Sequence, residues 1–203
     1  MWIRVVLLIL AVSVTSGLLP HLANAKGEYS TGGIHVAFSG VFASPNWEDE
    51  LREEIAEAIG GPALVSLGST GGFDMRAGYR FNERVDFEMG FEYLAPYSVD
   101  VVGLGGGQAS SWMYYVDFRL FLLTDRVQPY IVLGMGAYHI DYMAGLSGVA
   151  RDGTDFAPRL GGGLDYYIDY RWGLTGEINY VIGTRRLNER DRLAISFGAF
   201  YRF

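Results

Sequence analysis

The residues with the clearest potential for chemistry are a histidine and an aspartate two positions apart, His139 and Asp141. On a strand this spacing places both side chains on one face, where they could form half of a catalytic dyad or a metal pair. Catalysis also needs a nucleophile within hydrogen-bonding reach, and the sequence alone does not place Ser39 or Ser147 there. The chain has no cysteine, which excludes a cysteine metal site. Because no complete catalytic set is present, we expect no enzymatic activity, no metal and no cofactor.

Charged and apolar residues also alternate along several segments, so that each segment has one charged row and one apolar row. The charged rows contain Asp74, Arg76, Arg80, Asp86, Glu88, Glu92, Asp117, Arg119, Arg159, Asp165, Glu177 and Arg202, to which we add Asp141 and Arg192. The last segment shows the apolar row: Leu193, Ile195, Phe197, Ala199, Tyr201 and Phe203. These rows predict a wall with lipid on one side and a polar filling on the other.

The arginines in the middle of these segments decide which row faces lipid. One arginine at the bilayer midplane costs about 2–4 kcal/mol on the lipid side, so exposing Arg76, Arg119 and Arg159 would cost roughly 6–12 kcal/mol. That cost rivals the whole stability of a domain, so the charged rows must point inward. An eight-stranded barrel is only wide enough for side chains to fill. We therefore expect each of the three arginines to pair with a carboxylate within about 4 Å, as a static plug. A gated conduit or ligand site is the alternative.

Eight strands are expected, at 33–44, 71–82, 85–94, 111–123, 130–142, 156–168, 172–182 and 192–203. Short connections at 82–84, 124–129 and 169–171 alternate with longer ones at 45–70, 95–110, 143–155 and 183–191. This alternation predicts an all-β, antiparallel, up-and-down transmembrane barrel with periplasmic termini and long extracellular loops.

Two of these strands carry too little charge to orient them. Both rows of 33–44 are nearly uncharged, and its facing stays open. In 130–142 we point the row of His139 and Asp141 inward, which turns the row of Tyr130 outward. A bulge at Gly134 or Gly136 would switch the two faces.

Aromatic residues gather near the strand ends, where amphipathic rings settle at the two membrane interfaces. Near the short connections lie Tyr130, Trp172, Tyr201 and Phe203. Near the long connections lie Tyr93, Trp112, Tyr142 and Tyr180. We expect two aromatic girdles.

The first 25 residues read as a cleaved secretory signal peptide, with a basic start, an apolar run over 5–14 and the cleavage site Ala23-Asn24-Ala25. The barrel domain would then span 26–203. Beyond the signal, no apolar stretch is long enough for a transmembrane helix, although 50% of residues are hydrophobic. The net charge is −7 and Lys26 is the only lysine, so no basic patch points to nucleic acid.

The first long connection, 45–70, contains a predicted amphipathic helix that Asn46 can cap and Gly60 can end. Its apolar stripe is Trp47, Leu51, Ile55 and Ile59, and the remaining face is strongly acidic. A solvated acidic face is the simplest interpretation. The alternative is a surface that contacts an extracellular partner, or divalent cations near lipopolysaccharide.

Together these rows resemble the small outer-membrane β-barrel superfamily, which includes the membrane domain of OmpA, OmpX and the opacity-type surface proteins. The resemblance is carried by the strand rows, Gln128-Pro129-Tyr130, the run Gly161-Gly162-Gly163-Leu164-Asp165-Tyr166-Tyr167 and the terminal Tyr201-Arg202-Phe203. It implies a bacterial outer-membrane location among lipid and lipopolysaccharide. It also implies that Phe203 is the assembly signal read by the barrel-assembly machinery.

The resemblance implies a non-enzymatic role in envelope structure, or in surface interaction through the extracellular loops. A narrow channel for small solutes is one alternative. A membrane-embedded lipid-modifying hydrolase is another, because lipid A deacylases are similar in architecture. Their His-x-Ser-Asn motif is not matched by His139-Ile140-Asp141-Tyr142.

Overall fold

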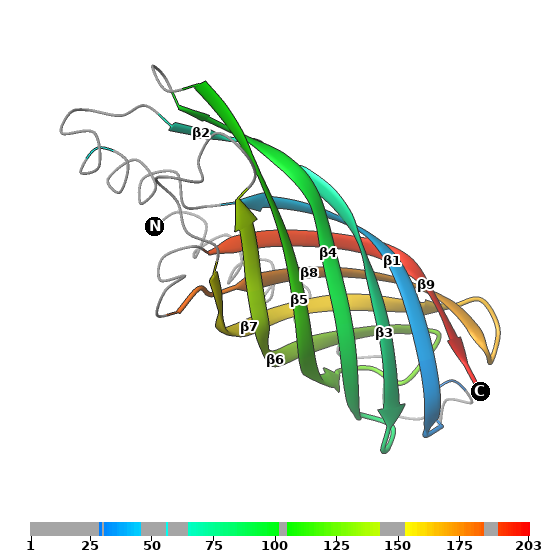
Figure 1. Cartoon of the computed structure of the whole chain (residues 1–203). Coiled ribbons are helices and arrows are strands. Elements are labelled where there is room, and N and C mark those ends of the chain that lie inside the picture. Colours follow the sequence, from blue (N-terminus) through cyan, green and yellow to red (C-terminus); the bar gives the residue numbers. More distant parts are fainter. Residues whose placement is uncertain are drawn as a thin grey trace.

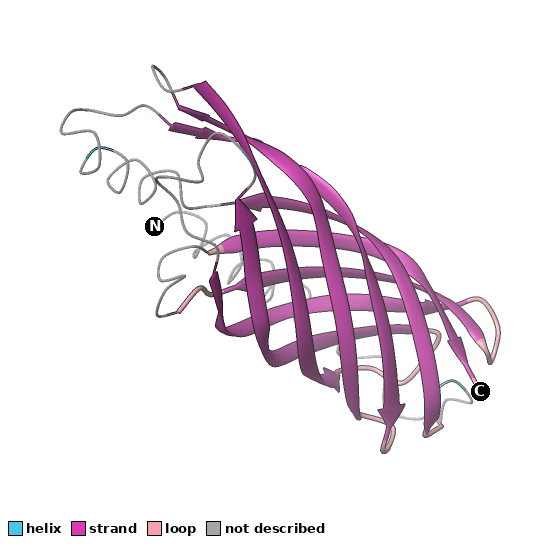
Figure 2. Ribbon diagram, viewed as in Figure 1, coloured by secondary structure: helices cyan, strands magenta, loops and turns pink. Residues whose placement is uncertain are grey.

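The computed structural model describes Tyr29, residues 31–45, Ala56, and residues 65–101, 105–142, 153–184 and 191–203. Its strands (Figures 1 and 2) are β1 (Gly33–Pro45), β2 (Val65–Leu67), β3 (Thr70–Arg80), β4 (Val85–Val101), β5 (Gly105–Phe121), β6 (Val127–Tyr142), β7 (Gly153–Tyr167), β8 (Trp172–Val181) and β9 (Arg192–Arg202). The predicted signal peptide and, apart from Ala56, the predicted helix at 46–60 lie outside the described residues. Within the described part, no helix combines the length and apolar character that a membrane crossing requires.

The strands form one antiparallel sheet that closes on itself. The order runs β4, β3, β1, β9, β8, β7, β6, β5, and the pairing of β4 with β5 completes the ring. The short β2 adds to β4 outside the ring, which leaves eight of the nine strands in the barrel. The predicted eight-stranded up-and-down barrel is therefore confirmed, and β2 is an element that was not predicted.

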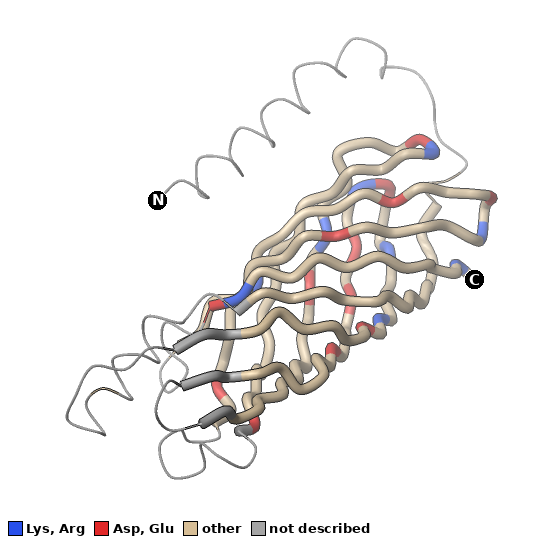
Figure 3. The backbone as a smooth tube through the Cα atoms, turned by 90° about the horizontal axis from the view of Figure 1, so that it is seen from above, with Lys and Arg blue, Asp and Glu red and all other residues tan. Residues whose placement is uncertain are grey.

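Side chains alternate between the two faces of this wall, as the period of a strand requires. In β8, for example, Thr175 and Glu177 are buried while Leu174 and Ile178 are exposed. In β9, 73% of the surface of Phe197 is exposed. The charged positions are interleaved along the strands (Figure 3). Apolar side chains thus cover the outside and charged ones fill the inside, which suits a wall surrounded by lipid.

β6 faces the opposite way from the prediction. Tyr130 and Val132 are buried inside, whereas His139 lies on the outward row with Leu133, which is 59% exposed. Asp141 shares this outward row, so it does not join the internal charges. No register shift interrupts the pairing of β6 with β5 or β7, so the glycines host no bulge. The inward row is apolar because it packs between other buried side chains: Phe121, Tyr130 and Val132 form one cluster.

The expected long connection at 95–110 is largely a hairpin. β4 continues to Val101, and β5 already begins at Gly105. Their pairing has one register shift, between Leu94 and Tyr97. Pro96 lies in this shift, where the missing backbone N–H of proline costs no ladder hydrogen bond. The alternation of the sequence breaks at the same place, which is why the strand was predicted to end there.

Polar side chains close two of the short turns. The Asn82 Oδ1 accepts hydrogen bonds from the backbone N–H groups of Arg84 and Val85, at 2.8 and 3.0 Å. The Asp169 Oδ1 accepts from the N–H groups of Arg171 and Trp172, both at 2.7 Å. These two bonds stabilise the carboxylate and lower the pKa of Asp169. The third short connection is shorter than expected, because β6 already begins at Val127.

Candidate functional site

Apart from Asp141, which lies on the outer wall, the structure places every residue of the predicted charge cluster inside the barrel, with buried side chains. Strand alternation explains this placement, because each of these residues shares its parity with the other charges of its strand. The three central arginines come from every second strand in the run from β3 to β7. Arg76 lies on β3, Arg119 on β5 and Arg159 on β7. Each of them has at least one carboxylate within 3 Å, so the predicted ion pairs are present.

Glu177, on β8, holds two of these arginines together. Its Oε2 lies 2.8 Å from the Arg76 Nη1, and its Oε1 lies 2.7 Å from the Arg159 Nη2. The Tyr130 hydroxyl from β6 donates a third hydrogen bond to Oε2, at 2.9 Å. One carboxylate therefore connects four strands, and each of its oxygens receives a charged donor.

Glu88, on β4, has the same role on the other side of the lumen. Its Oε1 lies 2.7 Å from the Arg119 Nη1 and 2.8 Å from the His35 Nε2, and its Oε2 lies 3.6 Å from the Arg76 Nη1. The other terminal nitrogen of Arg119 contacts Asp165, at 2.7 Å. His35 thereby brings β1 into the network.

The ion pairs form one continuous chain across the lumen. It runs through Arg192, Glu92, Arg159, Glu177, Arg76, Glu88, Arg119 and Asp165. Asp117 and Asp74 join from the side, 3.1 Å from the Arg159 Nε and 3.0 Å from the Arg76 Nε. With His35 from β1 and Tyr130 from β6, the network contacts all the strands of the ring.

Arg80 and Arg202 act differently from the central arginines, because they hold the backbone at the end with the short turns. Arg80 donates to the Asn82 carbonyl at 3.2 Å and to the Gln128 side chain at 2.7 Å. Arg202 donates to the carbonyls of Tyr29 and Tyr170, at 2.6 and 2.7 Å. The predicted cluster is therefore two groups: an ion-pair network in the middle and two arginines that fasten the turns.

Aromatic rings fill the space between the charges. The guanidinium of Arg119 lies 3.7 Å from the ring centre of Tyr130, and that of Arg159 lies 4.1 Å from the ring centre of Tyr115. The Tyr115 hydroxyl also donates a hydrogen bond to Asp74. Sequence reasoning missed these rings as parts of the network. Tyr115 shares its row with Asp117 and Arg119, and this parity is the signal that could have found it.

Glycines on the inward rows make room for these side chains. A Cβ on Gly90 would overlap the ring of Tyr115, and one on Gly78 would lie 2.6 Å from the ring of His35. The space that a glycine leaves on an inward row is thus taken up by the rings and carboxylates of neighbouring strands.

A small cavity lies among these groups. A cavity of about 10 Å³ remains beside His35, Asp86, Arg119 and Asp165. That is room for no more than about one water molecule. This cavity therefore does not form a continuous aqueous path.

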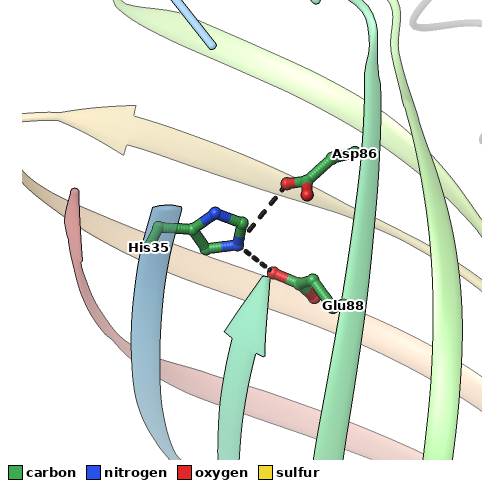
Figure 4. Close-up of side chains that lie close together, drawn as sticks. All are labelled: His35, Asp86 and Glu88. Atoms are coloured by element: carbon green, nitrogen blue, oxygen red, sulfur yellow. Dashed lines mark hydrogen bonds and ion pairs between the residues drawn. The ribbon is translucent and has the colours of Figure 1, made fainter. Parts of the chain in front are cut away.

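His35, Asp86 and Glu88 are a donor set that a metal ion could use (Figure 4). The His35 Nε2 lies 3.5 Å from Asp86 and 2.8 Å from Glu88. The Arg119 Nη1, however, lies 3.8 Å from the same Asp86 oxygen and 2.7 Å from Glu88. Because this guanidinium already compensates both carboxylates, the residues do not fit a second cation well.

The residues His139 and Asp141 lie together on the outer wall of the barrel. The His139 Nε2 is 2.7 Å from the Asp141 Oδ1, and its Nδ1 is 2.5 Å from the Thr154 hydroxyl. The Trp112 ring stacks on the imidazole, with 4.8 Å between ring centres. Thr154 comes from the neighbouring strand β7 and was not among the hydroxyls considered from the sequence. Of those two, Ser39 lies in the lumen beside Arg76, and Ser147 is outside the described residues.

Six of the eight predicted girdle residues lie on outward rows, and the side chain of a seventh, Tyr142, is outside the described ones. Trp172 and Phe203 are exposed near the short turns, and Tyr93 and Trp112 lie outward near the other end. Tyr130 is buried in the lumen and does not belong to a girdle.

Comparison with known proteins gives the same architecture. A family model described as "Outer membrane protein beta-barrel domain" matches residues 5–203. Outer membrane protein A of Shigella flexneri is 30% identical over 140 residues, which cover 62% of this chain and 38% of that protein. The protein of the same name from Escherichia coli O157:H7 is 29% identical over 136 residues, 62% of this chain and 37% of that protein. The chain thus spans less than half the length of these relatives.

Two solved structures share the fold at low sequence identity. Neisserial surface protein A has a TM-score of 0.60 and 15% identity, over 85% of this chain and 99% of that one. OprG from Pseudomonas aeruginosa has a TM-score of 0.58 and 15% identity, over 89% and 99%. From the closed ring, the outward apolar rows and the family match, we conclude that the chain belongs to the outer membrane protein beta-barrel domain family, as a small barrel of the bacterial outer membrane.

Proposed function

We propose that this protein is a non-enzymatic scaffold, which contributes to envelope structure or presents a surface for interaction outside the cell. The observation that carries the proposal is the ion-pair network of the lumen. It contacts every strand of the ring, and the cavity beside His35 and Arg119 has a volume of only about 10 Å³. A wall held from inside in this way supports loops rigidly and offers no route for solutes.

The electrical conductance of the purified barrel in planar lipid bilayers tests this proposal. We expect no steady current from the wild-type protein. A matched variant with Arg76, Arg159 and Glu177 all replaced by alanine removes the centre of the plug, and we expect it to conduct. A steady current from wild type at the level of this variant would reject the scaffold and support a narrow channel. An unchanged lipid A mass on expression of the protein is expected as well, and a shift would support a hydrolase.

A hairpin supports the idea of a presented surface. β4 and β5 extend beyond the other strands of the ring, at the end where β2 lies (Figure 1). Backbone pairing continues here from Tyr97 to Val101, opposite Gly105 to Ala109. The hairpin therefore holds its shape through its own hydrogen bonds, and the acidic segment 45–70 precedes it in the sequence. We place any extracellular partner on this hairpin and on that segment.

Replacing residues 98–108 with a two-residue Asn-Gly turn shortens the hairpin and leaves the ring intact. We expect the variant to keep the heat-modifiable gel migration of a folded barrel. If the role is surface interaction, cells that carry the variant lose binding to the partner surface, whereas cells with the wild-type protein keep it. Changing three of the acidic residues in 48–57 to their amides tests the preceding segment in the same assay. Binding that survives both changes would exclude these surfaces.

A further inference from the structure

The long-loop end of the lumen is lined mainly by apolar side chains. The buried inward residues there include Val41, Ala43, Leu94, Met113, Ile140 and Val181. Arg192 is a charged residue at the same level, but its guanidinium is paired with Glu92 and lies 5.0 Å from the ring centre of Tyr138. Buried apolar side chains offer water no hydrogen bonds, so this apolar layer disfavours the entry of water.

The short-turn end of the lumen is polar. The cavity of about 10 Å³ lies there, with His35, Asp86, Arg119 and Asp165 in its lining. Among the described residues, the Oδ1 atoms of Asp86 and Asp165 receive no hydrogen bond, although both side chains are buried. Buried carboxylate oxygens normally accept hydrogen bonds, so this end can take up water where the apolar layer cannot.

The chain just before β1 is attached at this polar end. We call Tyr29 and Thr31 the N-terminal strap. The Arg202 Nη1 donates to the strap carbonyls of Tyr29 and Thr31, at 2.6 and 3.4 Å, and its Nη2 donates to the Tyr170 carbonyl at 2.7 Å. Arg202 also lines the cavity, so one guanidinium borders the cavity and holds the strap.

The ring of Tyr29 rests on the same border. Its centre lies 5.5 Å from the ring centre of Tyr167, and it packs against the cluster of Ala37, Tyr167 and Phe200. Tyr167 and Phe200 both line the cavity. The strap therefore covers side chains that form the wall of the cavity.

The strap is held less firmly than the apolar layer. Strand pairing begins only at Gly33, so neither strap residue has a place in the sheet. Tyr29 is half-buried, whereas Ala43 in the apolar layer is 1% exposed. Chain ends with few buried contacts open at a small free-energy cost, far below that of global unfolding.

We propose that the N-terminal strap is a lid over the short-turn end of the lumen. When the strap lifts, water enters from this end and reaches Asp86 and Asp165, and the apolar layer stops it from passing through. The lumen is then a vestibule that opens to one side of the membrane only. This goes beyond the scaffold role, because it gives the closed interior one route of access.

The reactivity of single cysteines tests the lid. The protein has no cysteine of its own, so an introduced thiol reports on one position. Ala37→Cys lies under the strap and Ala43→Cys lies in the apolar layer, both on the inward row of β1. The barrel in lipid nanodiscs, where both ends face water, is treated with a small cationic methanethiosulfonate, and mass spectrometry follows the modification. We expect the Ala37→Cys variant to react at least about tenfold faster than Ala43→Cys, which corresponds to about 1.4 kcal/mol.

Removing the strap ring separates the lid from the rest of the lumen. In the Ala37→Cys background, Tyr29→Ala should raise the rate of modification about tenfold again, and in the Ala43→Cys background it should change nothing. Tyr166→Ala, at an outward tyrosine of β7 that is 41% exposed, is the matched control and should change neither rate. Heat-modifiable migration shows that each variant is folded. Equal rates at the two positions, or an Ala37→Cys rate that Tyr29→Ala leaves unchanged, would overturn the proposal.

Conductance distinguishes this proposal from the scaffold role. Tyr29→Ala should give no steady current in planar bilayers, because the apolar layer still closes the long-loop end. A current in Tyr29→Ala but not in wild type would overturn the one-sided vestibule and leave the scaffold role of the wild-type protein intact.

Discussion

The guanidinium of Arg76 and the carboxylate of Glu177 meet at 2.8 Å inside the barrel, and this contact joins β3 to β8 across the lumen. The two residues are 101 positions apart in the sequence and are not on neighbouring strands. Backbone pairing alone does not connect them. Contacts of this kind make the interior a second system of bonds in addition to the sheet.

Replacing Glu177 should destabilise the barrel strongly. Glu177→Gln keeps the size of the side chain but leaves Arg76 and Arg159 without their shared carboxylate, so we expect a loss of about 3–5 kcal/mol in the free energy of unfolding. Urea unfolding of the barrel in lipid vesicles measures this loss. Glu83→Gln, in an exposed turn, is the control and should change the free energy by no more than about 0.5 kcal/mol. Equal effects of the two substitutions would show that the network contributes little.

The two tyrosines at 114 and 115 should differ in their response to the loss of a hydroxyl. Tyr115→Phe removes the donor to the buried Asp74, so we expect a cost of about 1–3 kcal/mol. Tyr114→Phe changes a neighbour on the same strand that is 59% exposed on the outside, and we expect almost no change. The same unfolding measurement distinguishes them. A larger loss for Tyr114→Phe would contradict the facing of β5.

The facing of β6 can be tested by adding charge to its outer row. Leu133 is 59% exposed in the middle of the strand, so Leu133→Arg should cost about 2–4 kcal/mol by placing a guanidinium in hydrocarbon. Val127→Arg, at the end near the short turns, should cost only about 0–1 kcal/mol because the charge reaches the interface. Equal costs at both depths would show that this row does not cross the membrane.

The terminal phenylalanine should matter for assembly more than for the finished fold. Phe203 is 73% exposed, and its backbone N–H donates to the Ile34 carbonyl at 3.0 Å, a bond that does not need the ring. We therefore expect Phe203→Ala to lower the amount of assembled barrel in cells several-fold, and to leave unfolding of the purified protein nearly unchanged. Phe197→Ala, on the same outward row, is the control. Normal assembly of Phe203→Ala would reject its role as the signal.

Strand alternation was enough to predict most of the fold and of the charge cluster. It worked where an inward row carried charge, because only one facing avoids arginine in hydrocarbon. Arg76, Arg119 and Arg159 are the clear cases. It failed for β6, whose inward row is Tyr130, Val132 and Tyr138, because apolar residues fit both a packed lumen and lipid.

Other features depended on long-range register that a single sequence does not reveal. The inward position of His35 is meaningful only because β1 pairs with β3 and places Gly78 beside it, which leaves room for the ring to reach Glu88. Thr154 became a partner of His139 through the pairing of β6 with β7. The hairpin of β4 and β5 was hidden by Pro96, which breaks the local pattern while the strand continues.

The pairing of Glu177 with Arg76 has a consequence for biogenesis. Glu177 on β8 and Arg76 on β3 can form their ion pair only after β1 has paired with β9. A sheet that has not yet closed would therefore bring unpaired charged side chains into the hydrocarbon. Sealing of the seam and entry into the bilayer are therefore tied to one another. Until the last pair of strands has joined, the charged side chains of the lumen must remain hydrated.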